Sequence, residues 1–231
     1  MADRPYTILS CGVSLDGYLD AATPQRLVLS NEDDLRRVDG VRADADAILV
    51  GAATVRNDNP RLLVRSASLR RSRVARGLAE SPIKVTLTCT GALDPEGCFF
   101  TTGSSEKLVY CASGATPIAR SRLGAVATVV DAGDPVDVRE VVEDLGRRGV
   151  RRLMVEGGGR IHTQFLTADL ADELHLVVAP FFVGDPRAHR FAGSGAYPWH
   201  AGNRARLAET RQMGDVVLLR YVLSAREARS S

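Results

Sequence analysis

The sequence predicts an α/β protein with a largely parallel central sheet and helices on both faces. Strand-like and helix-like segments alternate over most of the 231 residues, which is the pattern of parallel strands joined by helices. Near the C-terminus, Arg204–Gln212 and Asp215–Leu223 flank Met213-Gly214 and predict an antiparallel hairpin. No linker or internal repeat divides the chain. We therefore expect a single domain over residues 1–231, with an ordered core of about 5–223.

Each element of this prediction rests on a local pattern of apolar residues and turn formers. Ser30 is expected to cap the first helix, because the acids that follow it suit the positive end of a helix dipole. Gly51 is expected to end the second long strand before a short helix or turn. The predicted strands are Tyr6–Cys11, Arg26–Leu29, Ala45–Val50, Lys84–Thr88, Lys107–Cys111, Ala125–Val130, Arg151–Val155 and Glu173–Ala179. The predicted helices are Asn31–Arg42, Pro117–Leu123, Val136–Arg148 and Gly159–Leu166.

Two polar stretches are expected to lack regular structure. Five arginines at positions 65, 70, 71, 73 and 76 predict a solvated loop in preference to a phosphate-binding flap. The tail Ser224–Ser231 is mostly polar and is expected to fray.

Composition and charge exclude several classes of function. A formal charge of +2 is too small for a general nucleic-acid binder. No apolar run approaches the length of a membrane helix, and the N-terminus lacks the apolar core of a signal peptide. Neither the cysteines nor the histidines have metal-ligand spacing, so no metal is assigned. The cysteine pattern favours a reducing cytoplasm.

The sequence "VEGGG" at Val155–Gly159 places three glycines between a predicted strand and a predicted helix. Gly157, Gly158 and Gly159 form a turn that lets a ligand approach the backbone, and Arg160 adds a positive charge at the helix start. This pattern is typical of a phosphate site, although it is not the dinucleotide fingerprint of a Rossmann fold. Glu156 would repel a phosphate, so it is better explained by a ligand group that donates hydrogen bonds.

A second cluster, "GAATVRNDNPRLLVR" at Gly51–Arg65, also follows a predicted strand. It contains Thr54, Asp58 and Arg65. Ligands of open α/β sheets collect at the carboxyl ends of strands. The two clusters are therefore expected to face one crevice.

Together with "SLDG" at Ser14–Gly17, these segments resemble the reductase domain of riboflavin biosynthesis, which has a dihydrofolate-reductase-like fold. The order and spacing of the three segments fit over nearly the whole chain. The resemblance implies an NADPH-dependent reductase that converts a ribosylamino-pyrimidine 5′-phosphate to the ribitylamino product. It also implies a homodimer. The signatures of the zinc deaminase that accompanies this domain in bifunctional relatives are absent, so we expect reduction without deamination.

The resemblance also assigns roles to residues. It implies that Thr54 and Asp58 contact the cofactor, with Thr90 in "LTCTG" near its adenosine end. Gly157, Gly158, Gly159 and the helix start at Arg160 are implied to hold the pyrophosphate. Arg42, Leu62, Arg65 and Glu156 are implied to contact the substrate. Asp58 and Glu156 are the candidates for catalytic proton transfer, because the cyclic glycosylamine must open to an imine before it can accept hydride.

Two residues depart from the family pattern and keep other functions open. Tyr18 stands where many members have a basic residue after the SLDG turn, and Arg26 stands where a small polar residue is common. A second hypothesis is a related NADPH-dependent reductase of another pyrimidine or pterin-like substrate, in secondary metabolism or in dihydrofolate reduction. A third hypothesis is a nucleotide-binding protein without catalysis.

Overall fold

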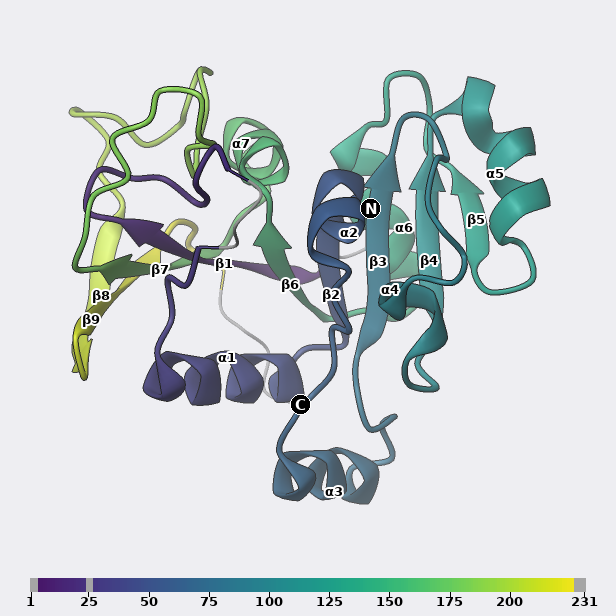
Figure 1. Ribbon diagram of the computed structural model, residues 1–231, viewed down its shortest axis with the longest axis horizontal. Coiled ribbons are helices and arrows are strands. Elements are labelled where there is room, and N and C mark those ends of the chain that lie inside the picture. The colour runs from purple at the N-terminus through teal and green to yellow at the C-terminus, as the bar shows by residue number, and fades with distance from the viewer. Residues whose placement is uncertain (1–3, 24–26, 227–231) are drawn as a thin grey trace. The chain divides into compact units, whose positions relative to one another are not determined.

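The computed structural model describes residues 4–23 and 27–226, which form two compact units (Figure 1). The first unit consists of Asp39–Met154 with the residues before Tyr6, and the second consists of Tyr6–Val38 and the residues from Val155 onward. The boundaries fall inside helix α1, Glu32–Asp44, and inside strand β6, Arg152–Gly157. The expected single-domain organisation stays a prediction.

The first unit is built on four parallel strands in the order β5-β4-β3-β2. The strands are β2 Ala47–Gly51, β3 Ile83–Thr88, β4 Lys107–Cys111 and β5 Thr128–Asp131. The side chains of β2, β3 and β4 are largely buried, as in parallel sheets that are covered on both faces, whereas those of the edge strand β5 are partly exposed. The strand patterns of the sequence therefore predicted these elements correctly, to within a few residues.

Helices cover this group of strands on both faces. Three connections step in one direction along the sheet, from β2 to β5, so right-handed crossovers place their helices on one side. Figure 1 shows α2 and α4 in front of these strands and α6 behind them. The helices are α2 Ala52–Asp58, α3 Ala67–Ala75, α4 Cys98–Thr101, α5 Thr116–Leu123 and α6 Val138–Arg147, with a short 3-10 turn at Ser113–Ala115.

Helix α3 corrects the expectation of a solvated basic loop. Arg73 is only 2% exposed, and its guanidinium donates to the carbonyls of Ala79, Ala43 and Ala45 at 2.7–2.8 Å. The side chain of Ser66 caps the helix by accepting from Leu69 N. Arg73 and Arg76 thus reach carbonyl oxygens about 30 positions away in the sequence, a partnership that charge patterning does not show.

Lys84 is a second buried cation in the first unit. It lies in the middle of β3 with no exposed surface, and its ammonium donates to the carbonyls of Phe99 and Thr102. Burial lowers the pKa of Lys84 to about 8. The lysine thus satisfies carbonyl groups at the end of the short helix α4.

The second unit contains the predicted C-terminal hairpin. Its strands are β1 Tyr6–Ser14, β7 Glu173–Ala179, β8 Arg206–Met213 and β9 Val216–Val222, in the order β1-β7-β9-β8. β1 and β7 are parallel, whereas β9 pairs antiparallel with both β7 and β8. A core cluster that includes Val177, Val216 and Leu218 lies on one face. These pairings confirm the mostly parallel α/β class with a closing antiparallel hairpin.

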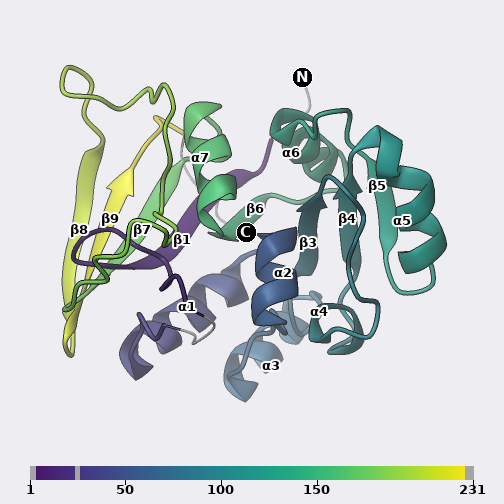
Figure 2. The same ribbon diagram turned by 45° about the horizontal axis from the view of Figure 1, so that its top comes forward.

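Helices α1 and α7, Gly159–Thr167, lie on opposite sides of β1 and β7 (Figures 1 and 2). The cap of α1 is Asn31 and not Ser30, because Asn31 Oδ1 accepts from Asp34 N and the helix starts one residue later than expected. The predicted strand Arg26–Leu29 is also wrong where it can be seen, since Leu27–Leu29 has no strand pairing. Arg26 lies outside the described residues.

A buried polar network joins α1 to β7. Arg37 bonds to Asp34 at 2.8 Å and approaches Nδ1 of His175 at 3.3 Å, and His175 Nε2 lies 2.8 Å from Glu173. Although burial opposes the effect, hydrogen bonds from His175 and Tyr6 lower the pKa of Glu173 to about 2. This network was not predicted, because Arg37 and His175 are 138 positions apart and no local pattern joins them.

The described part of the tail is anchored. Ser224 Oγ donates to the buried carboxylate of Asp172 at 2.6 Å, and Arg226 forms an ion pair with the same group. The expected fraying is therefore wrong for residues 224–226, and residues 227–231 lie outside the described chain. No helix among the described residues is both long and apolar enough to cross a membrane.

Candidate functional site

The glycine-rich turn of the second unit joins β6 to α7. Gly158 is the N-cap of α7 and has extended dihedral angles, φ −74° and ψ −166°, with no side chain capping the helix. The Gly157–Gly158 peptide bond is cis. The N–H groups of Gly159 and Arg160 have no intrahelical acceptor, and the Arg160 side chain is exposed. The turn therefore has the donors and the positive charge that an anion needs.

Two of the three glycines are also required by contacts within the protein. Gly157 has φ +109°, and a β-carbon there would lie 3.1 Å from Cε1 of His162. A β-carbon on Gly159 would lie 2.2 Å from the carbonyl oxygen of Arg190. All three glycines were predicted to serve a ligand, whereas packing alone accounts for Gly157 and Gly159.

Arg190 connects this turn to the SLDG segment. Its guanidinium donates to Tyr18 Oη at 3.0 Å and stacks 4.5 Å from the centre of the Tyr18 ring. Tyr18 is buried. This internal contact explains Tyr18, the residue that departs from the family pattern, without a ligand.

Asp16 of the SLDG segment holds the chain that leads to Arg190. It accepts hydrogen bonds from Ser14 Oγ and from the backbone N–H groups of Val183 and Gly184. The hydrogen bond from Ser14 is the main cause that lowers the pKa of Asp16 to about 2. The motif thus has a structural role in supporting the loop beside α7.

His162, one turn into α7, is completely buried beneath Gly157. Among the described residues, neither ring nitrogen has a hydrogen-bond partner of good geometry. Burial lowers the pKa of His162 to about 4, opposed by the nearby backbone of Val155 and Phe191 and by the charge of Glu156. His162 is therefore neutral at physiological pH. The histidine spacing was used only to assign no metal, so the burial of His162 was not predicted.

Glu156 is half-buried near the end of β6, one residue before the glycine turn. It lies at the same strand end as Gly157 and is partly exposed. The predicted roles of Glu156 in substrate contact and catalysis stay predictions.

In the first unit, the predicted cofactor residues follow two neighbouring parallel strands. Thr54 and Asp58 lie on α2 directly after β2, and Thr90 follows β3. The two segments are in contact, because Arg56 Nη1 donates to the Ala92 carbonyl at 3.4 Å and Asn59 Oδ1 accepts from Cys98 N at 2.6 Å. The structure therefore brings these residues to one edge of the first unit, with Asp58 and Thr90 exposed.

The predicted substrate residues of the first unit differ in their exposure. Leu62 is 3% exposed and adopts a left-handed conformation with φ +47°. Arg42 is 9% exposed and donates to the Leu63 carbonyl at 3.0 Å. Arg65 is exposed. Arg65 is thus the residue of this set whose charged end is best placed to meet a ligand.

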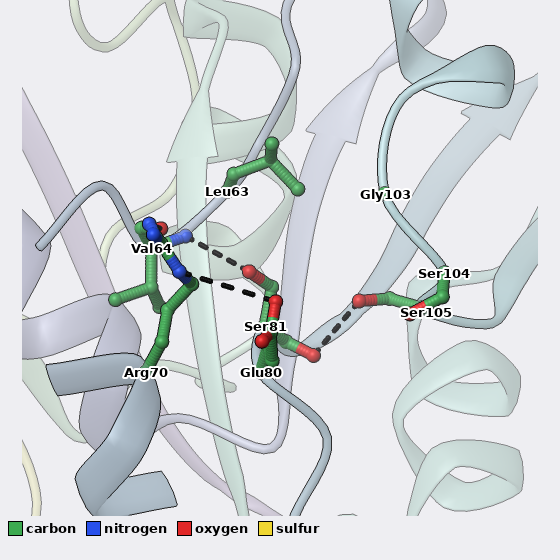
Figure 3. Close-up of a pocket in the computed structure, with 8 residues that line it drawn as sticks. All are labelled: Leu63, Val64, Arg70, Glu80, Ser81, Gly103, Ser104 and Ser105. Atoms are coloured by element: carbon green, nitrogen blue, oxygen red, sulfur yellow. Dashed lines mark hydrogen bonds and ion pairs between the residues drawn. The ribbon is translucent and has the colours of Figure 1, made fainter. Parts of the chain in front are cut away.

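A cavity of about 170 Å³ lies beside the segment between Leu62 and Arg65, whose residues Leu63 and Val64 form part of its lining (Figure 3). Val64 N donates to Ser81 Oγ, and Ser105 Oγ donates to the Ser81 carbonyl. The Arg70 guanidinium lies 3.9 Å from Glu80. The residues that line the cavity are Leu63, Val64, Arg70, Glu80, Ser81, Gly103, Ser104 and Ser105. None of them was predicted as a site residue.

Two further features bear on ligands. Trp199 donates its indole N–H to the Leu223 carbonyl at 3.0 Å, so it anchors the end of β9. Within residues 4–23 and 27–226, no group of three or more His, Cys, Asp or Glu side chains is arranged to hold a metal ion. The four cysteines are free thiols.

The chain is similar in sequence to reductases of pyrimidine phosphates. Residues 5–219 match the family described as the RibD C-terminal domain. A 2,5-diamino-6-ribosylamino-4(3H)-pyrimidinone 5′-phosphate reductase of Archaeoglobus fulgidus is 36% identical over 182 residues, which are 78% of this chain and 83% of the relative. A reductase of the same name from Methanothermobacter thermautotrophicus is 33% identical over 223 residues, covering 95% of this chain and 99% of the relative.

Solved structures agree on the fold. A pyrimidine reductase-like protein of Corynebacterium diphtheriae has a TM-score of 0.79 at 20% identity, over 94% of this chain and 91% of that protein. The fold therefore places the chain in the dihydrofolate-reductase-like class of α/β proteins. Within that class, the chain belongs to the RibD C-terminal domain family.

Proposed function

We propose that this chain is an NADPH-dependent reductase that converts 2,5-diamino-6-ribosylamino-4(3H)-pyrimidinone 5′-phosphate to the ribitylamino product in riboflavin biosynthesis. The observation that carries the proposal is the 36% identity to a reductase of that name over 83% of the relative's length. The uncapped glycine turn before α7 supports a phosphate-containing cofactor. We further propose a cytoplasmic location and a homodimer.

The residues at the glycine turn fit a nicotinamide dinucleotide. The N–H groups of Gly159 and Arg160 would donate hydrogen bonds to the pyrophosphate, and the extended backbone of Gly158 allows close approach. Thr54, Asp58 and Thr90 would contact the rest of the cofactor. When bound, NADPH supplies the hydride, which carries the electron pair for the reduction.

The substrate requires a proton transfer before it can be reduced. In a cyclic ribosylamine, C1′ has no acceptor for hydride until the ring opens. Protonation of the ring oxygen breaks its bond to C1′, and the nitrogen lone pair forms the C1′=N bond. Asp58 and Glu156 are the proposed groups that move this proton or stabilise the resulting cation. Arg42, Leu62 and Arg65 would hold the substrate, with Arg65 on its phosphate.

The proposal is tested by following NADPH oxidation with the purified protein. Turnover is expected with the diamino-pyrimidinone ribosylamine phosphate, and weaker or no turnover with the deaminated compound or with dihydrofolate. Calorimetric titration should show tighter binding of NADPH than of NADH. Tight NADPH binding without turnover on any of these compounds would favour a nucleotide-binding protein and would refute the proposed reaction.

A further inference from the structure

The carboxylate of Asp39 holds the backbone around Arg65. Asp39 Oδ1 accepts from Arg65 N at 2.6 Å, and Oδ2 accepts from Ser66 N at 2.7 Å. Asp39 is 5% exposed, so these bonds form largely out of contact with water. Charge-assisted hydrogen bonds of this kind are short and strong, and both carboxylate oxygens are used.

The backbone carbonyl of Arg65 also accepts a hydrogen bond within the protein. Arg70 Nη1 donates to the Arg65 carbonyl at 2.6 Å and to the Val64 carbonyl at 3.1 Å. Val64 N in turn donates to Ser81 Oγ at 3.0 Å. The main chain at Arg65 is therefore fixed from both sides of the residue.

The side chain of Arg65 is not fixed in this way. It is exposed, and within the described chain it forms no hydrogen bond or ion pair. By contrast, Arg70, Arg73 and Arg76 use their guanidinium groups on backbone carbonyls. A rigid main chain that presents one unpaired guanidinium suits recognition of an external anion.

We infer that Asp39 is a positioning residue for the substrate phosphate, because it fixes the backbone from which Arg65 reaches that phosphate. The inference rests on the proposed function, in which Arg65 contacts the 5′-phosphate. A purely structural role for Asp39, as an anchor for the start of α3, is the alternative. If Asp39 is a positioning residue, its substitution should impair the reaction of the phosphorylated substrate more than that of a dephosphorylated one. If its role is purely structural, both reactions should be impaired equally.

The Asp39→Asn variant separates them. Asparagine keeps the shape but turns an NH₂ group toward one of the two backbone N–H donors. We expect kcat/KM for the phosphorylated substrate to fall about 5–50-fold, mainly through KM, and kcat/KM for the dephosphorylated ribosylamine to change less than about twofold. Asp39→Glu, which keeps a carboxylate, should recover part of the loss and provides a second variant if Asp39→Asn folds poorly.

A double-mutant cycle with Arg65→Ala gives the decisive comparison. If Asp39 acts through Arg65, adding Asp39→Asn to Arg65→Ala should lower kcat/KM by less than about twofold further. Asp46→Asn is the matched control for the carboxylate, because Asp46 Oδ2 also accepts from two consecutive backbone groups, Arg151 N and Arg152 N. Arg71→Ala is the control for Arg65→Ala, because Arg71 is likewise exposed.

Equal losses on the phosphorylated and dephosphorylated substrates would overturn the inference, and so would additive effects in the cycle. If the dephosphorylated compound is inert with the unmodified protein, the cycle on the phosphorylated substrate decides alone. Failure of the proposed function is a separate result, since the unmodified protein would then fail to oxidise NADPH with the phosphorylated substrate.

Discussion

At the end of β6, Glu156 lies two residues before the helix cap Gly158, and the two residues are assigned to different ligands. Glu156→Gln preserves the shape of the side chain and removes its charge. We expect NADPH affinity to stay within a few fold while kcat/KM for the substrate falls ~10–1000-fold, or about 1.4–4 kcal/mol. Titration with NADPH followed by turnover measurements checks this expectation. Unchanged turnover would exclude Glu156 from the substrate site.

Gly158 tests the phosphate-binding turn. Its φ of −74° suits any residue, so Gly158→Val should fold while its side chain blocks the pyrophosphate. We expect NADPH to bind ~10-fold more weakly or worse, measured by calorimetry. Gly159→Ala is the contrast, because its β-carbon would meet the Arg190 carbonyl at 2.2 Å and should damage folding itself. A Gly158→Val protein that binds NADPH normally would rule out this turn as the phosphate site.

His162 predicts a loss of stability in acid. Its pKa is lowered from 6.5 to about 4 by burial. Between these values the unfolded chain binds a proton that the folded protein does not, so the unfolding free energy falls as pH decreases from 6.5 to 4. The full loss is on the order of 3 kcal/mol. Denaturant unfolding at several pH values should show this slope, and His162→Gln should flatten it.

The window above pH 4.5 is the informative one for His162, because the lowered pKa of Glu173 affects stability only below that value. His200→Gln, which removes an exposed ring, is the control and should leave the slope unchanged. An identical slope in His162→Gln would mean that other groups cause the acid sensitivity.

At the scale of elements, helix α3 depends on one buried guanidinium. Arg73→Met keeps the aliphatic length but removes the Arg73 hydrogen bonds to the carbonyls of Ala45 and Ala79, and leaves the Ala43 carbonyl with Arg76 alone of its two arginine donors. We expect the free energy of unfolding to fall by about 3–5 kcal/mol. Chemical denaturation measures the loss. Arg71→Met on the exposed side of the same helix should change stability by no more than about 0.5 kcal/mol, and a similar loss in both variants would contradict this account.

The elements also show what a sequence can reveal. Apolar strands such as β2 and β4, and the amphipathic helix α6, were predicted because the pattern of apolar residues within each segment indicates its burial. Helix α3 was missed because Arg73 finds its acceptors some 30 positions away. The shift of the α1 cap from Ser30 to Asn31 has a different, local cause, since two neighbouring residues were both good caps.

The candidate site was likewise predictable only where local sequence patterns indicate it. Glycine clusters and polar residues at strand ends identified the turn before α7 and the α2 region, because backbone chemistry requires those residue types there. The supporting contacts of Asp39 and Arg190 depend on residues distant in sequence, and no local pattern indicates them. The same limit explains why Gly159 was assigned to a ligand although Arg190 also requires it.

At the scale of the whole molecule, the homodimer is a testable proposal. β8 is the outer strand in the order β1-β7-β9-β8, and an uncovered strand edge favours association with another chain. Light scattering at micromolar concentration should give twice the mass of one chain. The mass of a single chain under these conditions would contradict the proposal.

The second unit is assembled from both ends of the polypeptide, which matters during synthesis. Ile8 in β1 pairs with Glu173 in β7, so a ribosome adding about 5–20 residues per second makes the second strand roughly 10–30 s after the first. For most of that interval β1 lacks both of its neighbours in the sheet, because β6 is made only shortly before β7, while β2 to β5 emerge consecutively. A nascent chain that stalls before β7 therefore exposes β1 to chaperones and proteases.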